Sequence, residues 1–319
     1  MLPRPGAVRT CLLVGRAMGC ARHRMRWAAS SVRTRAKAKR RVFVDANPGM
    51  AGGGTSFVPL PVSECHHVAK VLRLQPPAEV LVTFGDGRWL PGTLHHQDAS
   101  GTKRKNRQQL GVLISPGANT VVSAEPLPVT LSIAPPKAEA WCWIVEKCTE
   151  LGVDRVVPLV AQFGTGNDQQ QRLTDKGVTV MKQALKQCER AWTMPVDTFV
   201  PVQQFLSMRR RAAGDILLVA MEDESHRDGD ILTVLDALDQ EERAGDRPAI
   251  QRACLAVGPE GGWSDEEKRA LSEARQAGQP RSVFSVGLGR YILTTEAAAV
   301  MGTGLLCAWM ERRLSKKTA

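Results

Sequence analysis

Two short apolar runs near the C-terminal end of the chain each break into a glycine-rich loop and then enter a helical pattern. The first is Leu255-Ala-Val-Gly-Pro-Glu-Gly-Gly262, and the second is Val286-Gly-Leu-Gly-Arg-Tyr-Ile-Leu-Thr-Thr-Glu296. Such runs are typical of buried strands, and glycine lets the backbone come close to a ligand. A single glycine loop is more often only a turn, whereas two loops that each open a helix predict a binding cleft at the ends of neighbouring strands.

Acidic side chains around the first loop indicate which ligands this cleft excludes. Ser264 and Glu267 have the S-x-x-E spacing of a capping box, so a helix is expected to begin there. Asp265, Glu266 and Glu267 occupy its first turn, and Glu260 lies in the loop. These four carboxylates would repel a pyrophosphate at the helix N-terminus, and a Walker A lysine pattern is absent. The expected ligand is therefore cationic or rich in hydroxyl groups.

Strands and helices alternate from Pro128 onwards. The expected strands are 129–133, 156–160, 216–221 and 253–257, and the expected helices are 141–151, 173–190, 231–242, 264–278 and 297–309. Repeated strand–helix units predict a parallel sheet covered on both faces, with ligands bound at the carboxyl ends of its strands.

The residues from Val42 to about Glu125 have the pattern of a smaller domain. Strands are expected at 80–84, 88–95 and 110–114, the first two joined by the hairpin signal Asp86-Gly87. The polar, basic segment 100–109 is expected to be a loop, and its run of charged residues favours a solvated insertion.

At these residues the chain resembles the RsmE-type 16S rRNA (uracil-N3)-methyltransferases of the SPOUT superfamily. The family motif L-x-x-G-P-E-G-G-x-S-x-x-E is matched from Leu255 to Glu267, and L-G-x-x-I-L-x-T-E from Leu288 to Glu296. Three further segments are similar to the family in the same order: 66–74, 84–87 and 143–153. The resemblance covers about residues 41–309.

The resemblance implies the architecture of the chain. An α/β domain over 126–313 would hold a SPOUT-type parallel sheet with a C-terminal trefoil knot. Residues 42–125 would form a small N-terminal PUA-like β-barrel that helps to hold RNA. The expected partners are small-subunit rRNA and a second copy of the chain. The apolar C-terminal helix would pack in the homodimer, although its small residues could equally serve only the core of one chain.

The resemblance also implies S-adenosylmethionine as cofactor and places it between the two loops. The residues expected to bind it are Met221, Gly258, Glu260, Gly261, Gly262, Leu288, Gly289, Ile292 and Leu293. N3 of uracil carries a proton and must lose it to become a good nucleophile, so the site needs a base or a cation that stabilises the uracil anion. Arg290 is the expected cation. Thr295 and Glu296 are expected either to take part in the chemistry or only to cap the helix that follows.

Several positions depart from the family pattern. Tyr291 and Thr294 stand where relatives have arginine, Lys186 stands where they have glutamate, and 162–165 replaces a basic segment. Because these changes fall on groups that would contact RNA, a non-catalytic ribosome-assembly or RNA-binding protein that keeps the fold is the alternative. A nicotinamide-dependent α/β enzyme is a weaker alternative, since the acidic loop disfavours a pyrophosphate.

The formal charge of +11 belongs to the N-terminal segment. Twelve of the 43 lysines and arginines and none of the 32 acidic residues precede Asp45, which leaves 31 basic against 32 acidic side chains. Net charge is therefore no evidence that the folded body binds RNA. Residues 1–41 are expected to be a transit peptide or disordered, directing the protein to the mitochondrion, with the chloroplast as alternative; a basic tail that binds RNA is the competing interpretation.

Cysteine and histidine spacing favours neither a disulfide framework nor a metal site. The eight cysteines include no C-x-x-C pair and are expected to be mostly buried thiols in a reducing compartment. The adjacent histidines at 66–67 and 95–96 have no third ligand nearby, so no metal is expected. The apolar run at 11–14 is too short to span a membrane, and no membrane partner is expected.

Overall fold

The computed structural model describes residues 40–45, 55–98, 108–115, 120–164, 166–209, 214–276 and 281–317. The proposed transit segment lies almost wholly outside these ranges, as does Gly278, the expected end of one helix. The described residues form one compact unit that contains two β-sheets. Among them, no helix combines the length and hydropathy that a membrane crossing requires.

The larger sheet has seven strands, and every strand pair in it is parallel. The strands are β7 (Leu127–Ile133), β8 (Val153–Val160), β9 (Val200–Pro201), β10 (Asp215–Ala220), β11 (Gly229–Asp230), β12 (Arg252–Val257) and β13 (Val283–Gly287). Their order is β11-β13-β10-β12-β7-β8-β9. The prediction of an α/β fold with a parallel sheet is thus confirmed. The strands expected at 129–133, 156–160, 216–221 and 253–257 are β7, β8, β10 and β12.

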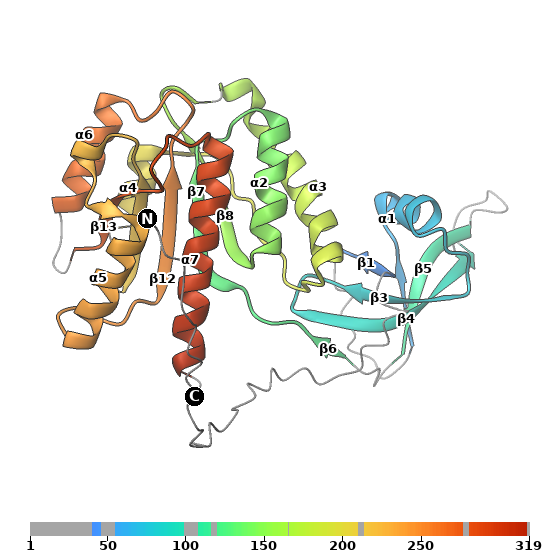
Figure 1. Cartoon of the computed structure of the whole chain (residues 1–319). Helices are drawn as coiled ribbons and strands as arrows, with labels where there is room; N and C mark the ends of the chain where they lie inside the picture. Colours follow the sequence, from blue (N-terminus) through green and yellow to red (C-terminus); the bar gives the residue numbers. More distant parts are fainter. Residues whose placement is uncertain are drawn as a thin grey trace, which may run out of the picture. The chain divides into compact units, whose positions relative to one another are not determined.

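Helices cover both faces of this sheet (Figure 1). They are α2 (Ala138–Glu150), α3 (Gln170–Cys188), α4 (Val202–Arg209), α5 (Ile231–Ala244), α6 (Asp265–Gln276) and α7 (Thr295–Lys317). Successive strand residues point to opposite faces, so β12 divides its side chains between two cores. Leu255 and Val257 pack in the cluster that contains α2, α3, α5 and α7. Cys254 and Ala256 pack in the cluster that contains α4 and α6.

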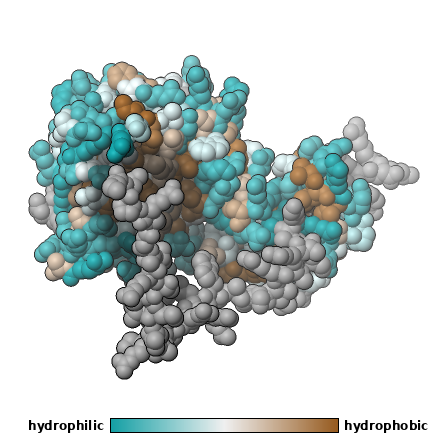
Figure 2. Space-filling view, viewed as in Figure 1, coloured by the Kyte–Doolittle hydropathy of each residue, from teal (hydrophilic) through white to brown (hydrophobic). Residues whose placement is uncertain are grey.

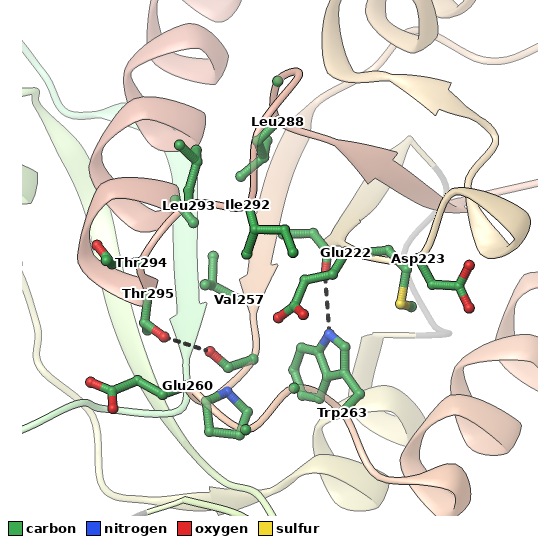
Figure 3. Close-up of a pocket in the computed structure, with 18 of the residues that line it drawn as sticks. Glu222, Asp223, Val257, Glu260, Trp263, Leu288, Ile292, Leu293, Thr294 and Thr295 are labelled. Carbon is green, nitrogen blue, oxygen red and sulfur yellow. Dashed lines mark hydrogen bonds between the residues drawn. The ribbon is translucent and has the colours of Figure 1, made fainter.

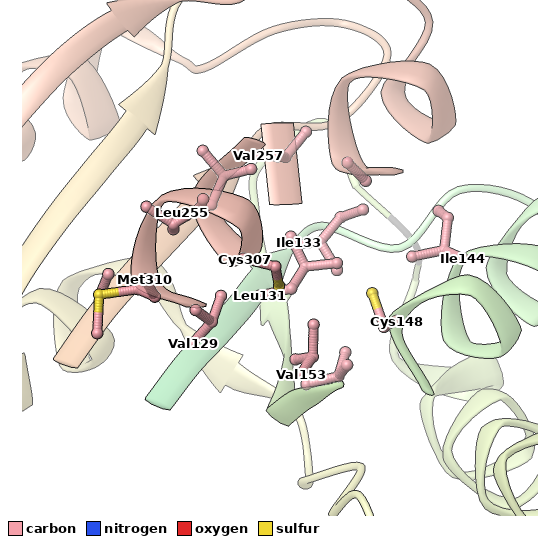
Figure 4. Packing of buried hydrophobic residues seen from close by; sticks show 14 of the residues in the cluster. Val129, Leu131, Ile133, Ile144, Cys148, Val153, Leu255, Val257, Cys307 and Met310 are labelled. Atoms are coloured by element: carbon pink, nitrogen blue, oxygen red, sulfur yellow. The ribbon is translucent and has the colours of Figure 1, made fainter. Parts of the chain in front are cut away.

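Helix α7 lies against β7 and β12 in the middle of the sheet. Its Cys307 and Met310 belong to the same buried cluster as Val129 and Leu131 of β7 (Figure 4). All four side chains are almost inaccessible to solvent. This packing fixes the start of α7, and with it the second glycine loop, over the carboxyl ends of the central strands.

The smaller sheet contains six strands: β1 (Arg41–Phe43), β2 (Ser56–Pro59), β3 (Ala78–Thr83), β4 (Arg88–Asp98), β5 (Gln108–Ile114) and β6 (Val121–Val122). Helix α1 (Val62–His66) and a π-helical turn, η1 (His67–Val71), follow β2. The predicted hairpin is confirmed as β3–β4, and Gly85 and Gly87 adopt the left-handed φ values of 80° and 87° that its turn requires. Residues 108–109 of the expected loop belong to β5, while 99–107 lie outside the described residues.

A buried ion pair joins α1 to α3. Nζ of Lys186 lies 2.6 Å from Oε1 of Glu64, and both side chains are buried. Oε2 of the same glutamate accepts a hydrogen bond from the backbone N–H of Phe43. The departure from the family pattern at Lys186 therefore has a partner within the chain.

Candidate functional site

A cavity of about 550 Å³ lies at the carboxyl ends of β10, β12 and β13 (Figure 3). Its lining comes from the segments 220–223, 257–263, 288–289 and 291–296, together with Arg227, Lys268 and Ala298. This is the edge of the parallel sheet at which ligands are expected.

The structure brings all nine predicted cofactor-binding residues together in this lining. They are Met221, Gly258, Glu260, Gly261, Gly262, Leu288, Gly289, Ile292 and Leu293. The two glycine loops also contact each other, because Oγ1 of Thr295 donates a hydrogen bond of 3.5 Å to the carbonyl oxygen of Gly258. The two glycine loops come from separate parts of the sequence, and they form one cleft as predicted.

The predicted capping box at the start of α6 is confirmed. The backbone N–H of Ser264 donates to Oε2 of Glu267 at 2.8 Å, and that of Glu267 donates to Oγ of Ser264 at 3.2 Å. Oε1 of Glu267 accepts a third bond, from the backbone N–H of Gln162. The buried Glu267 therefore joins the first glycine loop to the segment that follows β8.

The expected acidic surroundings are only partly as predicted. Of the four carboxylates expected around the first loop, Glu260 alone lines the cavity. Glu267 is occupied by main-chain donors, and Asp265 and Glu266 lie on α6 outside the lining. A position in the first turn of a helix does not determine whether a side chain faces the cavity, and Asp265 and Glu266 begin α6 without lining it.

Other carboxylates take their place. Glu222, Asp223 and Glu296 join Glu260 in the lining, against the cations Arg227 and Lys268. Bonds from the hydroxyl and backbone N–H of Ser225, and from His226, hold the pKa of Asp223 at about 2, so this carboxylate stays ionised. The excess of acidic groups favours a cationic ligand, as the sequence predicted.

Sequence reasoning did not identify Arg227. Its Nε donates to the carbonyl oxygen of Met221 at 2.7 Å, and its Nη2 donates to that of Glu222 at 2.5 Å. The arginine thereby holds the segment after β10, which forms one wall of the cavity. No local sequence pattern predicts this role, because the hydrogen-bond partners of Arg227 are main-chain atoms that any residue supplies.

The floor of the cavity includes Trp263, also absent from the prediction. Its Nε1 donates a 3.0 Å hydrogen bond to the carbonyl oxygen of Ala220, which links the first loop to β10. A Cβ atom at Gly258 would lie 3.0 Å from this ring, so the glycine makes room for the indole.

The other two glycines of the first loop are also required by its geometry. Gly262 has a φ of 73°, a conformation that favours glycine. A Cβ at Gly261 would meet Phe163 at 3.1 Å, so its missing side chain allows that contact.

The three predicted catalytic residues lie in different surroundings. Thr295 is buried and bonded to Gly258, and it is Thr294 whose Oγ1 accepts from the backbone N–H of Ala297 in the first turn of α7. Glu296 lines the cavity. Arg290 is exposed and outside the lining, although the residues on both sides of it belong to it.

Metal ligands and reactive thiols are not features of the described site. No group of three or more histidine, cysteine, aspartate or glutamate side chains is placed to hold a metal ion among the described residues. None of the described cysteines forms a disulfide bond, and Cys148, Cys254 and Cys307 are buried. Burial raises the pKa of Cys307 to about 12, which keeps its thiol protonated.

Residues 123–307 match the model of a protein family described as an RNA methyltransferase domain. Two curated relatives are named ribosomal RNA small subunit methyltransferase E. The one from Synechocystis is 29% identical over 259 residues, which is 80% of this chain and 74% of the relative. The one from Mycobacterium tuberculosis is 28% identical over 247 residues, which is 76% of this chain and 82% of the relative.

Solved structures share the fold. A ribosomal RNA small subunit methyltransferase E from Neisseria gonorrhoeae, bound to S-adenosylmethionine, superposes with a TM-score of 0.61 at 20% identity, covering 84% of this chain and 97% of its own. A methyltransferase from Legionella pneumophila, with S-adenosylmethionine as bound cofactor, gives the same TM-score and identity and covers 85% and 97%.

Proposed function

The chain belongs to the RNA methyltransferase family, and on that basis we propose that it transfers a methyl group from S-adenosylmethionine to N3 of a uracil in small-subunit rRNA. The observation that carries the proposal is the single cavity in which both glycine loops meet at the carboxyl edge of the parallel sheet. The names of the curated relatives support the rRNA substrate, and the resemblance to the RsmE-type enzymes supports N3 of uracil.

The cavity fits the cofactor in size and chemistry. Its volume of about 550 Å³ is within the usual range for small-molecule sites. Val257, Leu288 and Leu293 offer apolar surface to an adenine ring, and the glycine loops offer main-chain groups to its edge. The cofactor supplies an electrophilic methyl group on a positively charged sulfur, which the excess of lining carboxylates accommodates.

Each predicted catalytic residue receives a role in this proposal. Glu296, whose side chain lines the cavity, accepts the N3 proton of uracil. Arg290 stabilises the resulting anion from the rim beside Gly289 and Tyr291. Thr295 holds the two loops together through Gly258 and so keeps the acceptor aligned with the methyl group.

The architecture is proposed to follow the family. Residues 126–313 form the SPOUT domain, and the resemblance to the family supports a trefoil knot in its C-terminal part. Residues 42–125, which contain the six-stranded sheet, form the PUA-like barrel that holds RNA. The seven-stranded sheet lies within the first range, and the six-stranded sheet lies within the second apart from Arg41 at the start of β1, which supports this division.

The chain is further proposed to act as a homodimer through the outward side of α7. Gly302 faces inward, since a Cβ there would lie 2.7 Å from Cδ2 of Leu255, so this glycine serves the core of one chain. Ala297, Met301, Gly304 and Ala308 follow one another on the accessible side of the helix. Small residues along that side allow close approach of a second helix.

The mitochondrion is the proposed compartment, with the chloroplast as alternative. The support is the acid-free, arginine-rich segment that precedes Asp45. Its substrate would then be the small-subunit rRNA of that organelle.

Mass-spectrometric mapping of organellar small-subunit rRNA tests the function. Cells without the protein should lack one N3-methyluridine, and the full-length chain should restore it. Ribosome defects without loss of that nucleoside would instead favour the non-catalytic assembly protein.

A further inference from the structure

Two large side chains stand exposed at the mouth of the cavity. Tyr291 and Ile292 are each 78% exposed, and both line the cavity. Tyr291 is the single tyrosine of the 319 residues. Figure 2 shows apolar surface beside the N-terminal end of α7, where this segment runs. Exposure of this extent means that neither side chain contributes much to the core of the chain.

The backbone that presents them is anchored on both sides. Leu288 and Leu293 pack against the central hydrophobic cluster, and Thr295 is bonded to Gly258. Tyr291 and Ile292 therefore project from a short segment between two fixed points. An apolar pair held in this way is placed to receive a partner group without first becoming ordered.

The chemistry of the site selects that partner. The methyl acceptor has to reach the mouth of a cavity in which the methyl donor is bound. Four carboxylates and two cations line the cavity among the described residues, which disfavours a phosphate group at that point. An RNA base presented there must leave its helical stack, and aromatic side chains are the usual replacement.

Trp263 does not fill this role, because it is buried and its Nε1 is bonded to Ala220. Resting on the proposed function, we propose that Tyr291, with Ile292 beside it, is the stacking platform for an unpaired base of the RNA substrate at the methyl acceptor site. Recognition at this position then rests on stacking. Tyr291 contributes to RNA binding, whereas Ile292, which is also one of the predicted cofactor-binding residues, borders both ligands.

Steady-state kinetics of the full-length chain on bacterial small ribosomal subunits that lack N3-methyluridine test the platform. Tyr291→Ala should raise the KM for subunits by about tenfold, the order expected for loss of one base–aromatic stack. Tyr291→Phe should keep the KM within about twofold, since the ring face remains. The affinity for S-adenosylmethionine, measured by calorimetry, should not change. Leu232→Ala is the matched control, because Leu232 is an exposed apolar residue outside the lining. An unchanged KM for Tyr291→Ala overturns the proposal.

A chemical footprint gives a second readout. Because the chain has one tyrosine, the nitrotyrosine formed by tetranitromethane and measured by mass spectrometry reports on Tyr291 alone. A short single-stranded oligouridylate should protect it, and S-adenosylmethionine alone should not. A different outcome is protection of Tyr291 without RNA, to a degree that rises with protein concentration. If Tyr291→Ala also dissociated a dimer, the residue would belong to a contact between two copies of the chain, and the platform would be overturned. Protection by RNA without methylation by the wild type would contradict the proposed function and leave the platform standing.

Discussion

A Cβ atom at Gly287 would lie 2.9 Å from Nη1 of Arg227, so this glycine leaves the space that the guanidinium occupies. From that position Arg227 binds the carbonyl oxygens of Met221 and Glu222. The end of β13 and the segment after β10 thus shape one wall of the cavity together.

Arg227→Ala should weaken the binding of S-adenosylmethionine by about tenfold or more, because hydrogen bonds from a charged donor contribute about 1.5–3 kcal/mol each. Gly287→Ala should act in the same direction by displacing the guanidinium. The double variant should bind S-adenosylmethionine almost as well as Arg227→Ala, since without the guanidinium the new Cβ atom at position 287 has nothing to displace. Calorimetry measures all three, with Arg155→Ala, whose exposed guanidinium pairs with Asp197, as control. Additive losses would contradict the coupling.

Glu267→Ala should lower the free energy of unfolding by about 2 kcal/mol or more, since the backbone N–H groups of Gln162 and Ser264 lose their acceptor. Glu267→Gln should cost less, because an amide oxygen can still accept in a capping box. Glu266→Gln, in the same turn, is the control. Urea unfolding followed by circular dichroism provides the measurement, and equal stability of Glu267→Ala and wild type would refute the role of the capping box.

Lys186→Met should destabilise the fold by about 3–5 kcal/mol, because it leaves the buried carboxylate of Glu64 without its cation. Adding Glu64→Gln should recover part of this loss, since no charge then remains buried. The comparison by chemical denaturation distinguishes pairing from packing. A double variant as unstable as Lys186→Met would show that the ion pair is not the cause.

Stability should also fall as the pH drops through the ordinary pKa of histidine, about 6.5. Burial and the charge of Lys186 lower the pKa of His67 in the folded state. Below about pH 6.5 the unfolded chain therefore binds a proton at His67 more readily than the folded chain does. The stability that neutral His67 contributes is present above the ordinary pKa of histidine and is lost as the pH falls below it. His67→Gln should reduce this slope in thermal unfolding between pH 7.5 and 5.5. An unchanged slope would assign the pH dependence to other groups.

The parts of the fold that could be predicted depend on neighbours in the sequence. The capping box of Ser264 and Glu267 is a contact between residues three apart, and the buried strand β12 (Arg252–Val257) contains a local apolar run. Arg227 could not be predicted, because its carbonyl partners carry no sequence signal. In the sequence Lys186 is only a departure from the family pattern, since its partner Glu64 lies 122 residues away. Short elements such as β9 and α4 were missed because two to eight residues give too little periodicity to detect.

Arg290 and Arg227 should separate chemistry from cofactor binding. Arg290 lies on the exposed rim, outside the lining, whereas Arg227 holds a wall of the cavity. If Arg290 stabilises the uracil anion, Arg290→Ala should lower the single-turnover rate by about 100-fold, the order seen when one donor to a developing anion is removed, with cofactor affinity nearly unchanged. Arg227→Ala should show the opposite division, with weaker cofactor binding and a rate restored by saturating S-adenosylmethionine. The amount of N3-methyluridine formed by each variant, at limiting and at saturating S-adenosylmethionine, distinguishes these two effects. If Arg290→Ala kept the wild-type rate, the candidate for stabilising the uracil anion would be Lys268, which lines the cavity together with Arg227.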